Sequence, residues 1–381
     1  MKNRLLILST SIGAGHAKAG EALYEAYTAN HGGEAHHIDF LRYTSPTFGL
    51  WVEQMYYAIT KHTPSVYKLL YKLADHPNSP VKKSEVYIGL SKYKELLKEY
   101  RPDAIISTHF FPAAVTSYLY PRFRIPNSLV LTDYTAHHIF VNSNTNLFFA
   151  GYEGVVNELK ELGVEESRIR VTGIPIRPCF AKRLDQRAAR IKLELEPDLP
   201  VILIMSGGNA IGPLVDVLET LGRLTEKFQV IAIAGHNQKS YLELQQVLAR
   251  VSLRGRILGF VENIHEYMAA ADLLISKAGG LTVAEALAAS LPMLIIRPTP
   301  GQEDANTLFL TKAGAALHLK STTELEPVVG KLLREPAKIE TLKNNAARIA
   351  KPDAAEAILR EMEYLIAAKK GVEIRTSMIE S

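Results

Sequence analysis

The strongest constraint on the fold is an alternation of short apolar runs with helix-length segments that continues along the whole chain. The runs are rich in Val, Ile and Leu and do not alternate between apolar and polar residues. This pattern is typical of parallel strands covered by helices on both faces. They lie at residues 4–9, 34–40, 103–108, 128–133, 146–151 and 168–173, and then at 200–207, 228–235, 256–260, 272–277, 292–298 and 315–319. The sequence therefore predicts an α/β protein in which a doubly wound parallel sheet forms twice.

Prolines mark the connection between the two halves. The stretch "TGIPIRPCFAKRL", residues 172–184, contains Pro175 and Pro178, which favour an extended backbone. We therefore expect Rossmann-like domains over residues 1–172 and 173–352. A chain of 381 residues with 47% hydrophobic residues can bury two cores. The last helical segment, 353–381, is a candidate to return to the first domain.

Composition excludes several classes of protein. Cys179 is the only cysteine, so neither an internal disulfide nor a multi-cysteine metal site is expected. The apolar stretch after the first residues is shorter than a signal-peptide core or a membrane span of about 20 residues, which predicts a cytoplasmic protein. The net charge of +4 is mild, and we expect no nucleic-acid partner. The histidines that follow two strands match no metal-site spacing, so we expect no metal.

Two glycine-rich turns in the second half suggest a phosphate site. "MSGGN", residues 205–209, and "SKAGGLT", residues 276–282, each lie between a predicted strand and a predicted helix. Such turns expose backbone N–H groups at a helix N-terminus, and Lys277 adds a positive charge. Each turn alone also fits a tight strand-to-helix connection, but the pair favours a diphosphate ligand. The small residues of these turns are Gly207, Gly208, Ala278, Gly279 and Gly280.

A polar turn and an apolar strand end are further candidates for ligand binding. "RPTPGQEDANTLFL", residues 297–310, combines carboxylates and amides, which can both accept from and donate to sugar hydroxyls. Its alternative role is a charged first helical turn favoured by the helix dipole, above all for Asp304. Phe260 and Val261 follow another strand, where they either contact a base or belong to the core.

The first strand is followed by "STSIGAGHAKAGEAL", residues 9–23. Glycines at this kind of junction usually indicate a phosphate, but here they flank His16. Since the better phosphate turns lie in the other half, this turn need not be the nucleotide site. Its histidine is a candidate for proton transfer, because neutral imidazole accepts a proton near pH 7. Asp133, with His137 and His138, follows another strand.

The segment from Trp51 to Arg101 is aromatic and basic. Residues 61–101 contain nine Lys and Arg against four Asp and Glu. Basic residues are attracted to anionic lipids, and Trp and Tyr favour the membrane interface. A helical subdomain with aromatic core residues and a solvated basic face is the alternative.

Several of these stretches together indicate a family. "GAGH", "TDYTAHH", "VTGIPIRPCF", "MSGGN", "GFVENI", "KAGGLTVAEAL" and "PTPGQEDAN" span residues 13–306. In these the chain resembles the glycosyltransferases of family 28, most of all the diacylglycerol glycosyltransferases. The resemblance implies a GT-B fold, in which two doubly wound domains face each other across a cleft. It also implies inverting transfer of glucose or galactose from a UDP-sugar to diacylglycerol, without a metal, by a peripheral protein on the inner face of the cell membrane.

The resemblance also implies residue roles. For the donor, the residues of the glycine-rich turns would contact the diphosphate: Gly207, Gly208, Lys277, Ala278, Gly279 and Gly280. Phe260 and Val261, at a strand end, would contact the uracil. The polar helix residues Glu285, Gln302, Glu303 and Asn306 would contact the ribose and the sugar. For the acceptor they are Gly13, Gly15, His137 and His138, with His16 and Asp133 as catalytic residues. A transferase for a polyprenyl-linked or soluble acceptor, and a non-catalytic sugar-nucleotide-binding regulator, are the alternatives.

Overall fold

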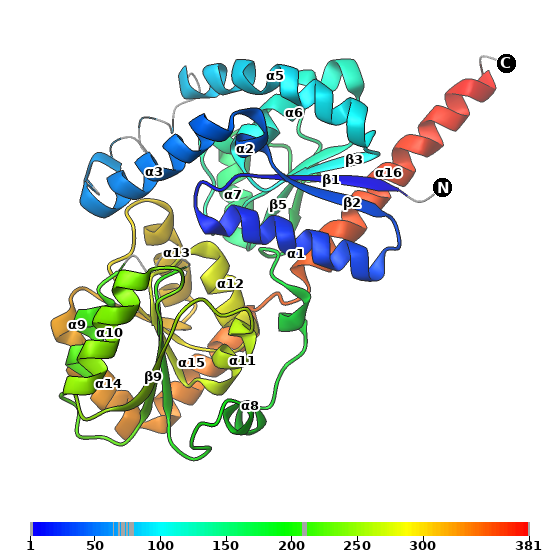
Figure 1. The fold of residues 1–381 in the computed structure, drawn as a ribbon. Coiled ribbons are helices and arrows are strands. Elements are labelled where there is room, and N and C mark those ends of the chain that lie inside the picture. The colour runs from blue at the N-terminus through cyan, green and yellow to red at the C-terminus, as the bar shows by residue number, and fades with distance from the viewer. Residues whose placement is uncertain are drawn as a thin grey trace. The chain divides into compact units, whose positions relative to one another are not determined.

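The structure is a computed structural model that describes residues 3–63, 65–67, 69, 73, 75, 80–207 and 212–379 (Figure 1). The chain divides into two compact units. The N-terminal unit comprises Met1–Pro178 and Pro352–Ser381, and the C-terminal unit comprises Cys179–Lys351. The division thus lies at the second proline of the predicted connection, a few residues beyond the expected boundary at 172/173.

The N-terminal unit contains a six-stranded parallel sheet with the order β2-β1-β3-β4-β5-β6. Every strand predicted in the first half is confirmed. The strands are β1 (Arg4–Ser9), β2 (Glu34–Asp39), β3 (Ala104–Ser107), β4 (Asn127–Val130), β5 (Leu147–Ala150) and β6 (Ile169–Val171). From β1 the chain goes to β2 on one side and later to β3 on the other. The gap between β1 and β3 is therefore the topological switch point, where ligands bind in open α/β sheets.

Helices cover both faces of this sheet. Successive side chains of a strand point to opposite faces, and in β1 they are apolar in both directions, so both faces need to be covered. Leu5 and Ile7 of β1 pack with α1 and α16, whereas Leu6 and Leu8 pack with α2, α5 and α6. The helical segments of the unit are α1 (Ala14–Asn30), α2 (Phe40–Thr44), α3 (Pro46–His62), α5 (Pro80–Tyr100), α6 (Phe110–Phe123), η1 (His138–Phe140), α7 (Glu153–Glu161), η2 (Glu166–Arg168) and α16 (Ala354–Ile379).

Helix α16 returns the chain to the N-terminal unit and packs on α1 (Figure 1). Its residues Ile358, Leu359 and Met362 join Leu23 and Ala26 of α1 in one buried cluster. Polar contacts reinforce this packing, since His31, the C-cap of α1, lies between two carboxylates of α16. The last helix therefore completes the core of the first sheet.

The C-terminal unit contains a second six-stranded parallel sheet, with the order β12-β11-β10-β7-β8-β9. Its strands confirm those predicted in the second half: β7 (Val201–Met205), β8 (Gln229–Ile233), β9 (Arg254–Leu258), β10 (Leu273–Ser276), β11 (Met293–Ile296) and β12 (Ala316–Leu319). The order is that of the dinucleotide-binding fold, with its switch point between β7 and β10. The helical segments are η3 (Pro178–Ala181), α8 (Gln186–Lys192), α9 (Leu214–Leu221), α10 (Gln238–Arg250), α11 (Ile264–Ala270), α12 (Gly280–Ala288), α13 (Gln302–Lys312), η4 (Thr322–Glu324), α14 (Leu325–Arg334) and α15 (Pro336–Ile349).

A buried ion pair holds α8 against the amino end of this second sheet. Nη2 of Arg190 lies 2.6 Å from Oδ2 of Asp272, and the backbone N–H of Val201 donates to the same oxygen over 2.8 Å. Nζ of Lys343, on α15, lies 3.4 Å from the other carboxylate oxygen. Asp272 thus joins α8, β7 and α15 at the end of the sheet opposite to the switch-point loops.

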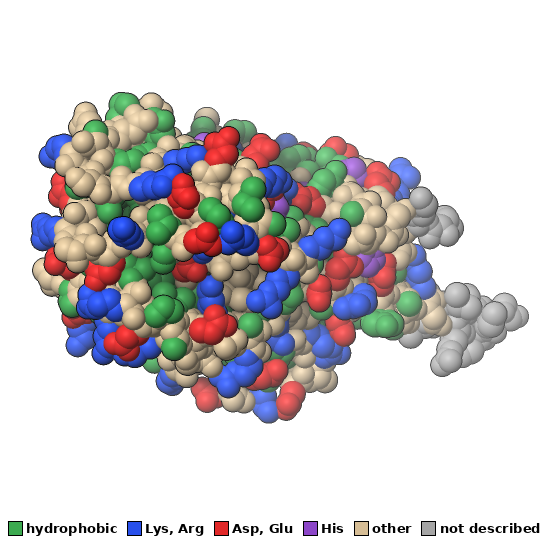
Figure 2. Space-filling model, turned by 90° about the horizontal axis from the view of Figure 1, so that it is seen from below, with side chains coloured by type: hydrophobic (Ala, Val, Ile, Leu, Met, Phe, Trp, Pro, Cys, Tyr) green, Lys and Arg blue, Asp and Glu red, His purple; other side chains and the backbone are tan. Residues whose placement is uncertain are grey.

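Figure 2 shows the charged side chains on one face of the molecule. On the face shown in Figure 2, acidic and basic groups are interspersed rather than segregated. Across the described helices, none is both long enough and apolar enough to span a lipid bilayer.

Candidate active site

The loops that follow β1 and β3 meet at the switch point of the N-terminal unit. The two strands pair with Leu8 opposite Ser107, and the N–H of Thr108 donates to the carbonyl of Leu8 over 3.0 Å. Gly13 has a φ of 77°, a backbone conformation that side chains with a Cβ rarely adopt. Because this turn is tight, α1 begins shortly after β1 and carries His16 in its first turn.

The hydrogen bonds of His16 define which ring nitrogen carries the proton. Nδ1 lies 2.7 Å from the carbonyl oxygen of Thr108 and 2.9 Å from Oγ1 of Thr132. A carbonyl only accepts, so Nδ1 carries the hydrogen and Nε2 holds the lone pair. No described residue hydrogen-bonds to Nε2. In addition, Oγ1 of Thr108 donates to the backbone carbonyl of His16 over 2.8 Å, which fixes the helix start on the strand end.

Burial keeps His16 neutral. It lowers the pKa of the imidazole to about 4, and the hydrogen bond to the carbonyl of Thr108 opposes this shift only in part. At neutral pH the lone pair on Nε2 is therefore available in nearly every molecule. The pair of ring nitrogens is arranged as a general base requires, with one nitrogen held and the other open.

A second histidine, His109, lies edge-on against His16, with ring centroids 4.6 Å apart and an angle of 87° between the planes. It is 4% exposed, and its Nδ1 accepts a hydrogen bond from the N–H of Phe111 over 3.2 Å, which caps α6. Burial and the neighbouring His16 lower the pKa of His109 well below its ordinary value. Both rings are therefore neutral at pH 7.

Two other residues predicted to belong to the site of this unit, Asp133 and His137, make no hydrogen bond to His16. Asp133 follows Thr132 in the chain, but the hydrogen bonds of His16 go to Thr108 and Thr132 and not to Asp133. Its catalytic role stays a prediction. His137 is 3% exposed, and its Nδ1 accepts from the N–H of Ile139 over 3.3 Å to cap η1. The ring thus caps η1, and contact of His137 with an acceptor stays a prediction.

Two further acceptor-binding candidates remain predictions. His138 is half-buried, and its backbone N–H donates to Oδ1 of Asp75 over 2.9 Å. Gly15 is half-buried in the first turn of α1, one residue before His16. Its position is consistent with a thin turn beside the base.

In the C-terminal unit, two glycine-rich turns follow the strands at the switch point. Gly207, after β7, has a φ of 64°, and no atom of the described residues lies within 4 Å of the position a Cβ would take. Gly279 caps α12 after β10, and a Cβ there would meet nothing nearer than Oγ1 of Thr282 at 4.0 Å. Gly208 lies outside the described residues. Among the described residues, none fills the space over the backbone at Gly207 and Gly279, and an anion at a helix N-terminus needs such space.

The cation of these turns already has a carboxylate partner. Nζ of Lys277 donates to Oγ1 of Thr299 over 3.1 Å and lies 3.6 Å from Oε1 of Glu303. Glu303 also accepts from the backbone N–H of Thr299. The predicted roles of Lys277 and Glu303 toward a diphosphate and a sugar therefore involve groups that are already paired with each other. Gln302, at the start of α13, and Glu285, on α12, are half-buried.

Two predicted donor-site residues are buried. Asn306 is 0% exposed, and its Nδ2 donates to the carbonyl of Ala278, also 0% exposed, over 2.8 Å. Asn306 thus fastens α13 to the glycine-rich turn, and its contact with the donor stays a prediction. Asp304 accepts from the N–H of Gly301 over 3.1 Å and thus caps α13.

Phe260 belongs to the surface rather than to the core. Its side chain is 46% exposed, and its ring stacks on that of His236, with centroids 4.2 Å apart and 15° between the planes. The two residues follow the neighbouring strands β9 and β8. Val261, next in the chain, is half-buried. An exposed aromatic pair at the sheet edge is consistent with the predicted contact to a base.

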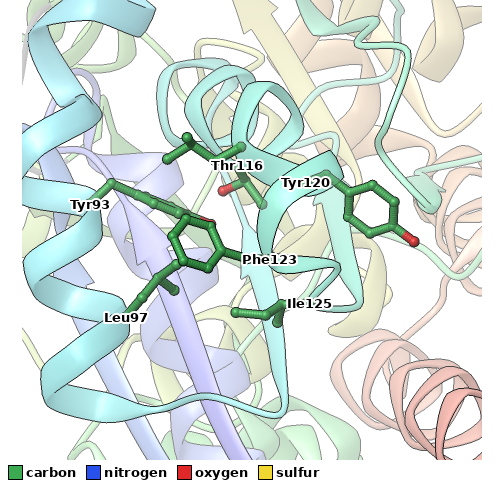
Figure 3. A pocket seen from close by; sticks show the side chains of 7 residues that line it. Tyr93, Leu97, Thr116, Tyr120, Phe123 and Ile125 are labelled. Carbon is green, nitrogen blue, oxygen red and sulfur yellow. The ribbon is translucent and has the colours of Figure 1, made fainter. Parts of the chain in front are cut away.

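The described residues add no metal cluster to this arrangement, and the pocket described below lies apart from it. Over the part of the chain that the structure describes, no three His, Cys, Asp or Glu side chains come together to hold a metal ion. A shallow pocket of about 10 Å³ between α5 and α6 has room for about one water molecule (Figure 3). It contains none of the predicted residues; its lining is Tyr93, Leu97, Thr116, Leu119, Tyr120, Phe123 and Ile125.

Sequence reasoning missed four residues of the two candidate sites. Each lies within three residues of the carboxyl end of a strand, which is the signal that could have found them. They are Thr108 and Thr132 beside His16, His236 beside Phe260, and Thr299 beside Lys277.

Comparison with known families agrees with this division of the chain. Residues 16–176 match the model of monogalactosyldiacylglycerol (MGDG) synthase, and residues 201–358 match that of the glycosyltransferase family 28 C-terminal domain. Among solved structures, MurG of Acinetobacter baumannii superposes with a TM-score of 0.62 at 14% identity, covering 96% of this chain and all of MurG. A co-structure of S. aureus MnaA with UDP superposes with a TM-score of 0.66, also at 14% identity, over 96% of this chain and 97% of MnaA. At such identities the superpositions establish the fold alone, a two-domain GT-B fold.

Closer relatives extend along nearly the full length of the chain. The processive diacylglycerol beta-glucosyltransferase of Bacillus licheniformis is 30% identical over 376 residues, which is 94% of each chain. Monogalactosyldiacylglycerol synthase 2 of Arabidopsis thaliana is 29% identical over 95% of this chain and 80% of its own. With both family models matched in order and this identity sustained through both sheets, the chain belongs to the family 28 glycosyltransferases of the diacylglycerol glycosyltransferase type.

Proposed function

We propose that this protein transfers a hexose, glucose or galactose, from a UDP-sugar to the free hydroxyl of diacylglycerol, with inversion at the anomeric carbon. Membership of the family supports the substrates. The observation that carries the chemistry is His16, a neutral imidazole with Nδ1 held by a carbonyl and Nε2 open.

The reaction needs a base and a stabilised leaving group. Nε2 of His16 takes the proton of the acceptor hydroxyl, whose oxygen forms the bond to the anomeric carbon. The bond from that carbon to the UDP oxygen breaks, and its electron pair leaves on the diphosphate. Backbone N–H groups at the turns of Gly207 and Gly279, together with Lys277, would stabilise this charge. The scheme requires no metal ion.

A lipid acceptor requires contact with a membrane surface. On α3, Leu50, Trp51 and Met55 are 49%, 56% and 41% exposed, and such side chains favour the bilayer interface. We infer that this helix rests on the anionic inner face of the cell membrane as part of a peripheral protein. Tyr93, by contrast, is 2% exposed in the core of the N-terminal unit, so at this position the alternative of an aromatic core residue holds.

A screen of donors against acceptors tests the proposal. Purified protein is incubated with UDP-glucose or UDP-galactose and with diacylglycerol vesicles, a polyprenyl-linked acceptor or a soluble alcohol, and the products are identified by mass spectrometry and NMR. We expect a β-linked glycolipid from diacylglycerol and from one preferred sugar. Transfer only to a non-lipid or polyprenyl acceptor would refute the lipid assignment. UDP-sugar binding without turnover of any acceptor would indicate a regulator instead.

A matched variant tests the base. His16→Ala should abolish transfer and leave the affinity for UDP unchanged, because the donor residues belong to the other unit. Transfer at the wild-type rate by this variant would remove His16 from the mechanism.

A further inference from the structure

His109 has one ring nitrogen that its structural role leaves unused. Its Nδ1 accepts from the backbone N–H of Phe111 over 3.2 Å. A backbone amide only donates, so Nδ1 holds the lone pair and Nε2 carries the hydrogen. None of the described residues accepts a hydrogen bond from this Nε2–H. The side chain as a whole is 4% exposed.

His16, edge-on to this ring, has the opposite tautomer. Its Nδ1 carries the hydrogen, which the carbonyl of Thr108 accepts, and its Nε2 holds a lone pair. The ring centroids are 4.6 Å apart. Two neighbouring rings at the ends of β1 and β3 therefore present one open acceptor and one open donor.

An alcohol has the complementary set of groups, since a hydroxyl donates one hydrogen bond and accepts up to two. We propose that the N–H at Nε2 of His109 donates a hydrogen bond to the oxygen of the acceptor alcohol whose proton Nε2 of His16 removes. This inference rests on the proposed function and adds a second residue that touches the acceptor.

The step balances without any further group. The hydroxyl proton moves to Nε2 of His16, one oxygen lone pair stays bonded to the N–H of His109, and the other forms the bond to the anomeric carbon. His109 keeps its own proton, and the electron pair of the breaking bond leaves with UDP. Holding one lone pair stops rotation of the hydroxyl and directs the other at the sugar, a contribution of orientation.

His137 shows that capping alone does not predict this role. It caps η1 through Nδ1 as His109 caps α6, but its Nε2 lies 3.6 Å from a carboxylate oxygen of Asp75. The two histidines differ at Nε2: in His137 it lies beside a carboxylate, whereas in His109 it has no described partner and lies next to His16.

Two amide substitutions separate the roles of the two nitrogens. In His109→Asn the shorter amide reaches the place of Nδ1, where its oxygen can still cap α6, but it presents no donor at the place of Nε2. In His109→Gln the longer amide puts an N–H near the place of Nε2 and loses the cap. Each variant is thus the control for the other. Melting temperature reports the cap, and steady-state kinetics with diacylglycerol and the UDP-sugar report the donor.

We expect the Asn variant to melt close to wild type and to lose about 10-fold in kcat/KM for the acceptor, with an unchanged KM for the UDP-sugar. The Gln variant should melt at a lower temperature and keep acceptor kcat/KM within about 3-fold of wild type. Wild-type kinetics in the Asn variant, or equal losses in both variants, would overturn the proposal. So would ¹H–¹⁵N spectra of the wild type that place the His109 hydrogen on Nδ1, a measurement that does not depend on any variant folding.

The proposed function fails separately. If the wild type ignores diacylglycerol but glycosylates another alcohol, the lipid assignment is wrong, and the same comparison is made with that alcohol. If no alcohol is glycosylated, both proposals are refuted.

Discussion

The acid limb of the pH–rate profile follows from the surroundings of His16. Burial lowers the pKa of its imidazole to about 4, and a general base is active only when unprotonated. The perturbation is a change of pH from 8 to 5 at concentrations of diacylglycerol and UDP-sugar below KM. Under these conditions kcat/KM reports the ionisation of the free enzyme.

The size of the effect separates this environment from an ordinary one. With a pKa of about 4, about 90% of His16 is neutral at pH 5, whereas an unperturbed histidine near 6.5 would be about 3% neutral. The expected kcat/KM at pH 5 is therefore nearly that at pH 7, about 30-fold above what an unperturbed base allows. The measurement uses initial rates of UDP release, with vesicles of zwitterionic lipid so that membrane binding does not titrate. If kcat/KM instead falls to half its maximum near pH 6.5, the assignment of the imidazole of His16 as the base is refuted.

Four further predictions concern other contacts of the structure. Thr132→Val should lower kcat about 3- to 10-fold, because a neutral hydrogen bond to Nδ1 of His16 is lost, while Thr132→Ser keeps it; equal rates in both variants contradict the role. Asp272→Asn should lower the free energy of unfolding by about 3 kcal/mol in urea titrations, since it leaves the buried Arg190 unpaired; a change below about 1 kcal/mol would show that the pair is solvated. Burial alone lowers the pKa of His31, but the hydrogen bonds to Glu363 and Glu356 outweigh burial, so the pKa in the folded protein is raised. Protonated His31 should therefore stabilise the fold most below pH 6.5, and this stabilisation should be lost as the pH rises through the folded pKa. His31→Gln should then cost about 1–2 kcal/mol at pH 6 and less at pH 9, and a cost independent of pH contradicts it. Trp51→Ser should weaken binding to anionic vesicles about 5-fold in flotation assays, whereas Lys92→Ser, at a lysine paired with Glu95, should change it less; equal effects would argue against insertion of α3.

The sequence predicted the central strands β1, β3, β7 and β8 because their continuous apolar runs record burial on both faces directly. His16 was also predictable, since the glycines before it force a tight turn at a strand end. Its partners were not, because Thr108 and Thr132 lie 92 and 116 residues away and meet it only through the order of the strands. Nor could the sequence show that packing buries Asn306 and His137, because residue type alone does not reveal where a polar side chain points.

The return of α16 to the first sheet has a consequence for the order of folding. During synthesis the N-terminal residues leave the ribosome first, but one face of the N-terminal core is completed only by Ile358, Leu359 and Met362, which are made near the end. The C-terminal unit, residues 179–351, is complete before those residues appear. At about 5–20 residues per second, some 200 residues between β5 and α16 take on the order of 10–40 seconds to synthesise. Throughout that interval Leu23 and Ala26 expose an apolar surface that chaperones can bind, and a chain truncated before α16 would keep that surface permanently.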